Sequence, residues 1–419
     1  MFALTVAAVA SPAPLPTSAS SASPHPRDQI VLRPSSSPAP DNGLKTGAYV
    51  RAYRAFLASD PKEQGANSSV AIGGNIMTIA YAAYGWQRWR AFGSIEYQTL
   101  DAFGRDSSVG NMFEANLAYC VHGLLVKVGD QLFSSPWADS HQVFGLPPTP
   151  YQGIDAVYSS GRFALEEADI TRFLSRNSTT FQADTAIVNG PATSGFSYSR
   201  FTYLPSSDAS MNAYDYDMRS LVSIEWFDFK QRLRTANWSP YIAMQGGFEH
   251  SAGAANLGNV ASRIAGAELG VQRGTLDLDV ATDDIASSDG ARGWVSPYTE
   301  GYAADPLYTT GGWEGLPDDR AFGTSYAVFG GDSSGQFRFE TSYGWYNQSY
   351  IVNPSAWYVN SATASPEKSR EWDSLLTYDP ERREKNPCGL LYRLAFTHFV
   401  SPQGRKDYLR PQVEFTTCR

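Results

Sequence analysis

The sequence predicts an all-β fold, a transmembrane antiparallel up-and-down β-barrel of about 18 strands with inward-folded loops. Apolar and polar residues alternate through segments of about 9 to 12 residues, the length that a tilted strand needs to cross hydrocarbon. Strands of soluble proteins most often have about 5 or 6 residues. Short and long connections alternate between the segments, and aromatic residues recur at segment ends, as at the interfaces of a bilayer. These aromatic residues are Tyr49, Trp86, Trp89, Trp345, Tyr346 and Phe415.

In the final segment, the alternation raises the question of which face of the strand meets water. In "DYLRPQVEFTTCR" the residues from Leu409 to Phe415 alternate strictly between apolar and polar. In a soluble sandwich the apolar set would point into a core, whereas in a membrane barrel it meets lipid. The segment lengths and the alternation of loop lengths favour the barrel. We therefore expect Arg410, Gln412 and Glu414 to face a wet interior, and this strand to close the barrel against the strand around Arg51.

Candidate strands follow one another from Thr46 onward, and an even number places both ends of the barrel chain on one side of the membrane. The predicted ranges are 46–58, 69–84, 89–101, 111–121, 123–130, 152–158, 161–172, 181–189, 195–204, 215–228, 237–248, 262–272, 275–282, 321–330, 335–346, 370–378, 389–400 and 407–415.

The connections alternate in length. Tight ones are predicted at 85–88, 122–123, 159–161 and 273–274, and long ones at 131–151, 283–320 and 347–369. Bacterial outer-membrane barrels have this parity, with short turns on one side and long loops on the other. The 131–151 connection carries four aromatic residues among four prolines, so we expect this stiff, apolar loop to pack inside the bore. The alternative is a lid over the outer rim.

The two ends of the chain differ from the middle. Residues 1–10 contain an apolar run that ends in Ala8-Val9-Ala10, which is an A-x-A cleavage pattern. We interpret them as an export signal whose true start is missing; the alternative is a disordered apolar terminus. Residues 11–44 are rich in Pro, Ser and Ala and predict a flexible tail. The barrel is expected over 45–415, followed by a short extension at 416–419.

Composition and motifs exclude several functions. The net charge is −9 and no basic cluster occurs, so a nucleic-acid partner is not expected. No run of about 18 apolar residues is present, so no transmembrane helix is expected. H-E-x-x-H and C-x-x-C pairs do not occur, and "GGDSSG" at 330–335 is interpreted as a hairpin turn. We predict no enzymatic activity, no cofactor and no metal site.

Five stretches together resemble the OprD-type porins, the substrate-selective porins of Gram-negative outer membranes. They cover most of residues 46–415, and their order and spacing carry the resemblance. The stretches are "VRAYRAF", "VKVGDQLFSSPW", "PPTPYQGIDAVYSSGRFAL", "DPLYTTGGWEGLPDDRAFG" and "LYRLAFTHF…YLRPQVEF".

The resemblance implies a barrel of the bacterial outer membrane that lets small solutes diffuse passively. These solutes would be carboxylate-bearing nutrients such as amino acids or small organic acids, and the protein a monomer or loose trimer. In this family the third and seventh long loops fold inward, and a ladder of basic residues faces acidic loop residues. The basic side would be Arg51, Arg393 and Arg410, and the acidic side Asp305 and Glu314.

Further residues of the constriction follow from the same resemblance. Trp137 lies in the third long loop. His141 stands where the family tends to place an arginine, so the resemblance carries no arginine over to that position.

Alternatives remain open at three places. If residues 401–406 form a hairpin loop, Arg393 lies opposite Glu414, and the pair can serve only to hold the wall. Asp305 and Glu314 can lie on a solvated outer loop. The same register brings Cys388 and Cys418 together at the rim, as a disulfide or as two free thiols.

Two other classes of protein also remain open. One is a soluble, secreted β-rich protein, either a carbohydrate-binding protein or a hydrolase that uses its Trp and Tyr residues to hold sugars. The other is a barrel that serves adhesion without conductance.

Overall fold

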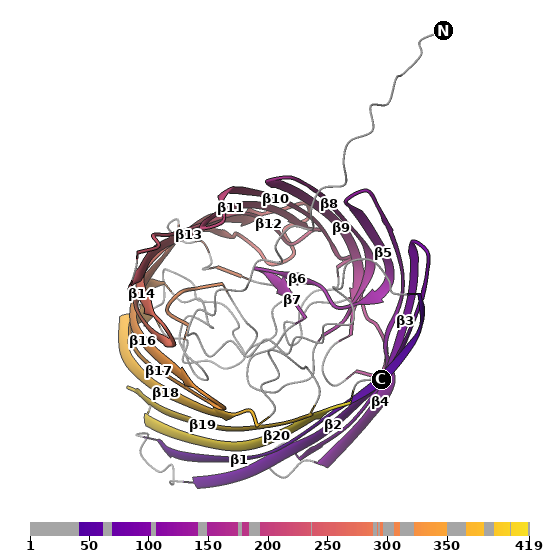
Figure 1. Cartoon of the computed structure of the whole chain (residues 1–419). Coiled ribbons are helices and arrows are strands. Elements are labelled where there is room, and N and C mark those ends of the chain that lie inside the picture. The colour runs from indigo at the N-terminus through magenta and orange to yellow at the C-terminus, as the bar shows by residue number, and fades with distance from the viewer. Residues whose placement is uncertain are drawn as a thin grey trace.

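A computed structural model shows eighteen strands in one closed antiparallel barrel (Figure 1). It describes residues 42–61, 69–101, 106–140, 149–174, 178–183, 193–235, 237–287, 291, 294–295, 306–310, 322–349, 366–380, 389–402 and 404–417. In these ranges no helix is long and apolar enough to cross a membrane. The first barrel strand pairs with both the second and the last, which closes the sheet.

The barrel strands are long, and each pairs with its neighbours in sequence order. Two further strands, β6 (Ser134–Ser135) and β7 (Ala138–Asp139), form a small hairpin inside the ring (Figure 1). The barrel strands are β1 (Gly43–Pro61), β2 (Ser69–Trp86), β3 (Trp89–Asp101), β4 (Asp106–Val121), β5 (Leu124–Gln131), β8 (Tyr151–Ser160), β9 (Phe163–Phe173), β10 (Phe196–Ser206), β11 (Ala209–Met218), β12 (Val222–Arg232), β13 (Ser239–Ser251), β14 (Ala261–Arg273), β15 (Leu276–Ser287), β16 (Gly323–Ser334), β17 (Phe337–Ser349), β18 (Pro366–Tyr378), β19 (Gly389–Ser401) and β20 (Gly404–Thr416).

The orientation of the last strand agrees with the membrane interpretation. In β20 the side chains of Arg410, Gln412 and Glu414 are buried, whereas Leu409 and Phe415 are exposed. Because the barrel is closed, buried here means turned toward the interior. The strand pairs with β1 and closes the barrel, as the sequence predicted, and in the observed register Glu414 lies opposite Arg51.

Other strands show the same division of faces. Ile95 and Tyr97 of β3 are exposed and Glu96 is buried, and β15 exposes its leucines while it buries Asp277 and Asp279. Such an apolar outer face is what a lipid-facing wall requires. Two of the predicted interfacial aromatics do not fit, because Tyr49 and Tyr346 are buried inside the barrel. Position at a strand end suggested the interface, but the two-residue period places both side chains on the inner face.

The parity of the connections is confirmed where the structure describes both strands. Tight turns join β2 to β3 at Gln87–Arg88, β4 to β5 at His122–Gly123 and β14 to β15 at Gly274–Thr275. "GGDSSG" ends β16 and turns at Gly335, whose φ of +64° suits glycine. The long connections follow β5, β15 and β17, as predicted.

Two predicted strands are wrong, and the errors cancel in the count. No wall strand lies between β9 and β10, which pair directly, so the prediction over 181–189 fails. Phe181 packs against a cluster inside the barrel, and an extended loop segment packed on one side has the same period as a strand. The prediction over 215–228 merges β11 and β12. Ser220 makes the turn between them with a φ of +63°, without the glycine that normally marks it.

The β19–β20 hairpin is tighter than predicted. Gly404 already belongs to β20, so Arg393 lies opposite Gln412, and Leu391 lies opposite Glu414. Pro411 in β20 lacks an N–H to donate, and the β1–β20 register passes from Tyr53–Gln412 to Phe56–Leu409 without a pair at Pro411. The interruption accommodates a proline inside a barrel strand.

Candidate functional site

Three neighbouring strands turn arginines toward the interior. Arg393, Arg410 and Arg51 lie on β19, β20 and β1, and the side chains of Arg51 and Arg410 are fully buried. The alternation within each strand fixes this common face. The barrel therefore carries a row of guanidinium groups on one side of its inner wall, at the three positions that the resemblance had implied.

Glu414 engages one of the three arginines. Arg393 donates from Nη1 to Glu414 Oε1 at 2.5 Å, and Gln412 donates to the same oxygen at 2.6 Å. The ion pair is diagonal across the hairpin rather than directly opposite, because the hairpin register differs from the predicted one. The geometry thus matches the wall ion pair that the sequence left open for Arg393.

Arg51 is held differently. Its Nη2 donates to Met77 Sδ at 3.6 Å, a weak acceptor, while Nε and Nη1 have no hydrogen-bond partner in the described part of the chain. The Arg410 guanidinium lies 5.2 Å from the centre of the Tyr53 ring, on the same inner face. A guanidinium presents a planar fork of donors that fits a carboxylate. Among the described residues Arg51 is therefore the arginine of this row with the most unused donors, and its side chain has no exposed surface.

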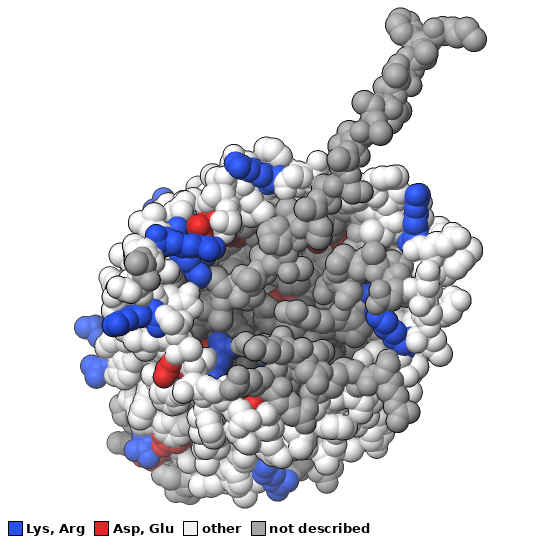
Figure 2. Space-filling model, viewed as in Figure 1, with Lys and Arg blue, Asp and Glu red and all other residues white. Residues whose placement is uncertain are grey.

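The part of the inner wall that adjoins these arginine strands is acidic. Strands β13 to β18 bury eight carboxylates among the described residues. They are Glu249, Glu268, Asp277, Asp279, Asp283, Glu340, Glu371 and Asp373. Figure 2 shows Lys and Arg side chains around the edge of this end of the barrel and a carboxylate deep within it. Charged groups of both signs therefore line the bore, and walls of low dielectric strengthen their field.

The connection after β5 enters the barrel, as predicted for 131–151, in its described part. Trp137 has no exposed surface; its ring centre is 5.1 Å from that of Trp226 on β12 and 4.9 Å from that of Trp294. The backbone N–H of Trp137 donates to the Tyr216 hydroxyl at 3.3 Å. Trp294 belongs to the connection between β15 and β16, so two long connections meet on the same stretch of wall.

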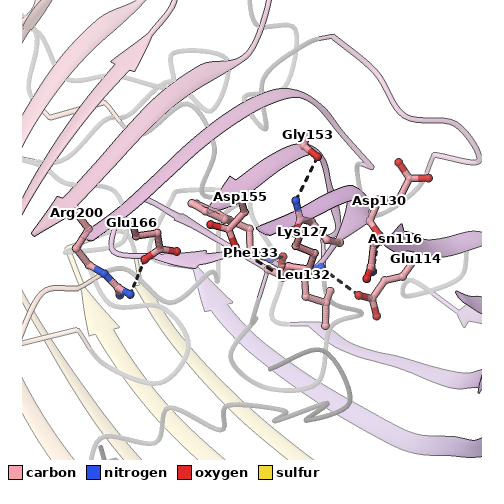
Figure 3. A network of polar contacts seen from close by, with 12 residues as sticks. Glu114, Asn116, Lys127, Asp130, Leu132, Phe133, Gly153, Asp155, Glu166 and Arg200 are labelled. Atoms are coloured by element: carbon pink, nitrogen blue, oxygen red, sulfur yellow. Dashed lines mark hydrogen bonds and ion pairs between the residues drawn. The ribbon is translucent and has the colours of Figure 1, made fainter. Parts of the chain in front are cut away.

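A polar network fixes the start of this connection (Figure 3). The Leu132 N–H donates to Glu114 at 3.2 Å, and Lys127 donates to the Leu132 carbonyl at 3.3 Å. Lys127 also lies 3.9 Å from Asp155. Because Glu114, Lys127 and Asp155 come from β4, β5 and β8, the loop leaves the wall at a place built by three strands. Further along the wall, Arg200 pairs with Glu166 at 2.5 Å.

Several predicted residues lie outside the described part of the chain. These are His141, Asp305, Glu314, Cys388 and Cys418. Cys120 is a free thiol. Within the described ranges, no group of three or more His, Cys, Asp or Glu side chains could hold a metal ion.

Sequence reasoning missed most of the residues that hold the loops. Alternation assigned the polar face of the final strand correctly, but Glu114, Glu249 and Asp283 received no role. Their signal was available in principle, because each is a carboxylate at an inward position, and Glu249 and Asp283 also lie near the ends of their strands. Their partners are backbone N–H groups of the loops, which no side-chain pattern reveals.

Comparisons with known proteins agree with the architecture. No family model matches the chain, and no curated protein matches it. Solved structures match almost its whole length. A BenF-like porin from Pseudomonas fluorescens has a TM-score of 0.72 at 12% identity, and covers 90% of this chain and 99% of its own.

Two matches from Pseudomonas aeruginosa were solved with ligands. OpdK with vanillate has a TM-score of 0.70 at 13% identity, over 90% of this chain and 99% of that one. OccK2 with glucuronate has a TM-score of 0.71 at 15% identity, over 90% and 96%. The chain therefore has the fold of the OprD/Occ family porins.

Proposed function

We propose that the chain is a non-enzymatic porin of the bacterial outer membrane that lets small carboxylate-bearing solutes diffuse through its bore. The observation that carries this proposal is the closed barrel with an apolar exterior and a buried row of arginines beside buried carboxylates on the inner wall. Passive diffusion needs a wet bore and a field, and binding must stay weak enough for release. Two proteins of the same fold were solved with vanillate and with glucuronate, and both compounds carry a carboxylate.

The proposal assigns different roles to the three arginines. Arg51 is assigned to the solute carboxylate, since two of its nitrogens have no acceptor among the residues that the structure describes. Arg410 adds positive potential to the same row. Arg393 holds the wall with Glu414. Asp305, Glu314 and His141 stay as sequence-based predictions for the constriction, with Trp137 as the aromatic anchor of the third long loop.

Planar-bilayer recording tests the proposal. We expect discrete conductance steps from purified protein, and interruptions of the current when vanillate or glucuronate is added but not when glucose is added. Arg51→Gln removes the planar charged fork, and we expect it to weaken the carboxylate effect about tenfold. Arg54→Gln is the matched control, because Arg54 lies on β1 close by but is exposed on the outer face.

The recording tests both the porin function and the role of Arg51 as the solute contact. Absence of steps in the wild-type protein would contradict the porin and support the barrel without conductance. Equal effects of the Arg51 and Arg54 variants would leave the porin intact but exclude Arg51 as the solute contact.

The soluble carbohydrate-binding protein or hydrolase is the less favoured class. It would have to expose the apolar belt of the barrel to water, and soluble proteins seldom expose large apolar patches. Extraction separates the two classes. We expect the protein to need detergent and to migrate differently on gels with and without boiling. Cross-linking in the same detergent would distinguish the monomer from the loose trimer.

A further inference from the structure

Thr309, in the connection between β15 and β16, is held by the inner wall on every polar side. Its N–H donates to Asp283 Oδ2 at 2.7 Å. Its carbonyl accepts the Tyr346 hydroxyl at 3.2 Å, and its own hydroxyl lies 2.6 Å from Ser325 Oγ. Thr309 has no exposed surface, and Asp283 is almost fully buried. Three strands thus contribute one contact each to a single loop residue.

Apolar contacts on either side reinforce this attachment. Leu307 is buried in the interior cluster that includes Trp294. Tyr308 packs against Ala281, Ala327 and Phe329, which belong to β15 and β16. The wall carries alanines at this place, so the loop can lie close against it.

A second wall carboxylate holds the same connection nearer its start. Glu249 Oε2 accepts the Val295 N–H at 2.7 Å and the Ser262 hydroxyl at 3.2 Å. Glu249 and Val295 are both buried. A buried backbone N–H needs an acceptor, and a carboxylate is a stronger acceptor than a neutral group.

We propose that Glu249 and Asp283 are positioning residues whose carboxylates hold two segments of this connection, at Val295 and Thr309, against the inner wall and thereby set the width of the bore. The effect on the width of the bore rests on the proposed porin function, whereas the attachment of the connection to the wall is independent of that function. Two fixed acceptors, on β13 and β15, hold these two segments at defined places on the wall.

Asp284 provides a matched control for Asp283. It follows Asp283 directly on β15 and accepts the Thr324 hydroxyl at 2.8 Å, also from β16. Its side chain is exposed on the outer face, where it cannot reach the loop. Removing Asp284 therefore costs one hydrogen bond between the same two strands and leaves the attachment of the connection unchanged.

Chemical labelling measures the attachment without relying on conductance. Thr309→Cys is introduced into a chain whose three native cysteines are replaced by Ser, and the labelling rate with a soluble maleimide is recorded. Asp283→Ala should raise this rate about tenfold or more, because the loop residue detaches more often from the wall. Asp284→Ala should leave the rate unchanged. If Asp283→Ala does not assemble, Asp283→Asn replaces it. Because this variant keeps one acceptor oxygen, it should raise the labelling rate above that of the unsubstituted protein by less than about tenfold.

Bilayer recording of the same variants tests the consequence for the bore. Asp283→Ala and Glu249→Gln should each change the open-channel conductance and increase its fluctuations relative to Asp284→Ala. Unchanged labelling in both Asp283 variants would overturn the attachment. If the Asp283 variants label faster but the wild-type protein never conducts, the attachment is upheld and the porin function is refuted. Faster labelling with unchanged conductance would refute the role in bore width.

Discussion

At the scale of single residues, hydrogen-bond partners separate arginines that the sequence treats alike. The inward position of Arg410 follows from the two-residue period, and those of Arg51 and Arg393 were implied by the family resemblance; the structure turns all three inward. The period cannot say that Glu414 engages Arg393, because a hairpin register of two residues more or fewer keeps every face and changes every partner. Faces were predictable, and pairs were not.

Removing the carboxylate of Glu414 should destabilise the barrel. Glu414→Gln leaves Arg393 without its ion-pair partner, and we expect a loss of about 1–3 kcal/mol in the free energy of unfolding. Asp407→Asn is the control, since Asp407 pairs with His398 and Arg405 nearer the solvent and should cost less than about 1 kcal/mol. Urea unfolding in detergent measures both. Equal losses would argue against a special role for the Arg393–Glu414 pair.

Gly344 is required by a close approach. A Cβ at this position would lie 2.2 Å from the Tyr346 hydroxyl oxygen, so Gly344→Ala must displace the ring that donates to Thr309. We expect faster labelling at Thr309→Cys in this variant. Gly330→Ala in β16 is the control, because its Cβ would meet only Leu278 Cδ2 at 3.2 Å. A Gly344→Ala barrel that labels no faster than the control would show that Tyr346 is dispensable.

At the scale of elements, aromatic packing decides where the long connections go. Trp137 and Trp294 come from different connections and meet at Trp226 of β12. The sequence predicted that the proline- and aromatic-rich loop would pack inside, because exposing so many aromatic rings to water is unfavourable. It gave no sign of the second tryptophan as partner, since contacts between loops depend on the closed barrel.

Trp137→Ala should loosen the third long connection while the barrel stays assembled. Truncating a buried aromatic typically costs about 3–5 kcal/mol, and here the loss falls on loop packing rather than on strand pairing. We expect a larger and noisier single-channel conductance. Trp345→Ala removes an exposed outer tryptophan and should leave the conductance unchanged. Identical conductance in both variants would contradict the inward-packed loop.

The pairing of Cys388 with Cys418 stays a prediction at this scale. The ladder between β19 and β20 pairs Gly389, which directly follows Cys388, with Thr416, which is two residues before Cys418. We expect mass spectrometry to detect a disulfide that disappears with reductant. Full alkylation of both thiols without reductant would exclude it.

One turn and one packed loop segment account for the two strands that the sequence predicted wrongly. Ser220 turns the chain between β11 and β12 without glycine or proline, and the strands on either side enforce its left-handed backbone. Phe181 lies in a loop segment but alternates like a strand, because it packs against the interior cluster. In both cases tertiary contacts override the local pattern. The predicted number of barrel strands was still correct, because one error added a strand and the other removed one.

At the scale of the whole molecule, the porin function requires the outer face of the barrel wall to contact lipid and the inner face to contact water. The barrel turns Leu276, Leu278 and Val280 outward and Asp277 and Asp279 inward along a single strand. A bilayer outside and water inside is the arrangement that leaves neither set in an unfavourable solvent.

Spin labels placed one at a time at residues 276 to 280 of β15 test this orientation most directly. In lipid vesicles we predict alternation: labels at 276, 278 and 280 collide with oxygen dissolved in the hydrocarbon, and labels at 277 and 279 collide with a water-soluble nickel reagent. The reverse alternation, or uniform access of the nickel reagent to all five positions, would contradict the account.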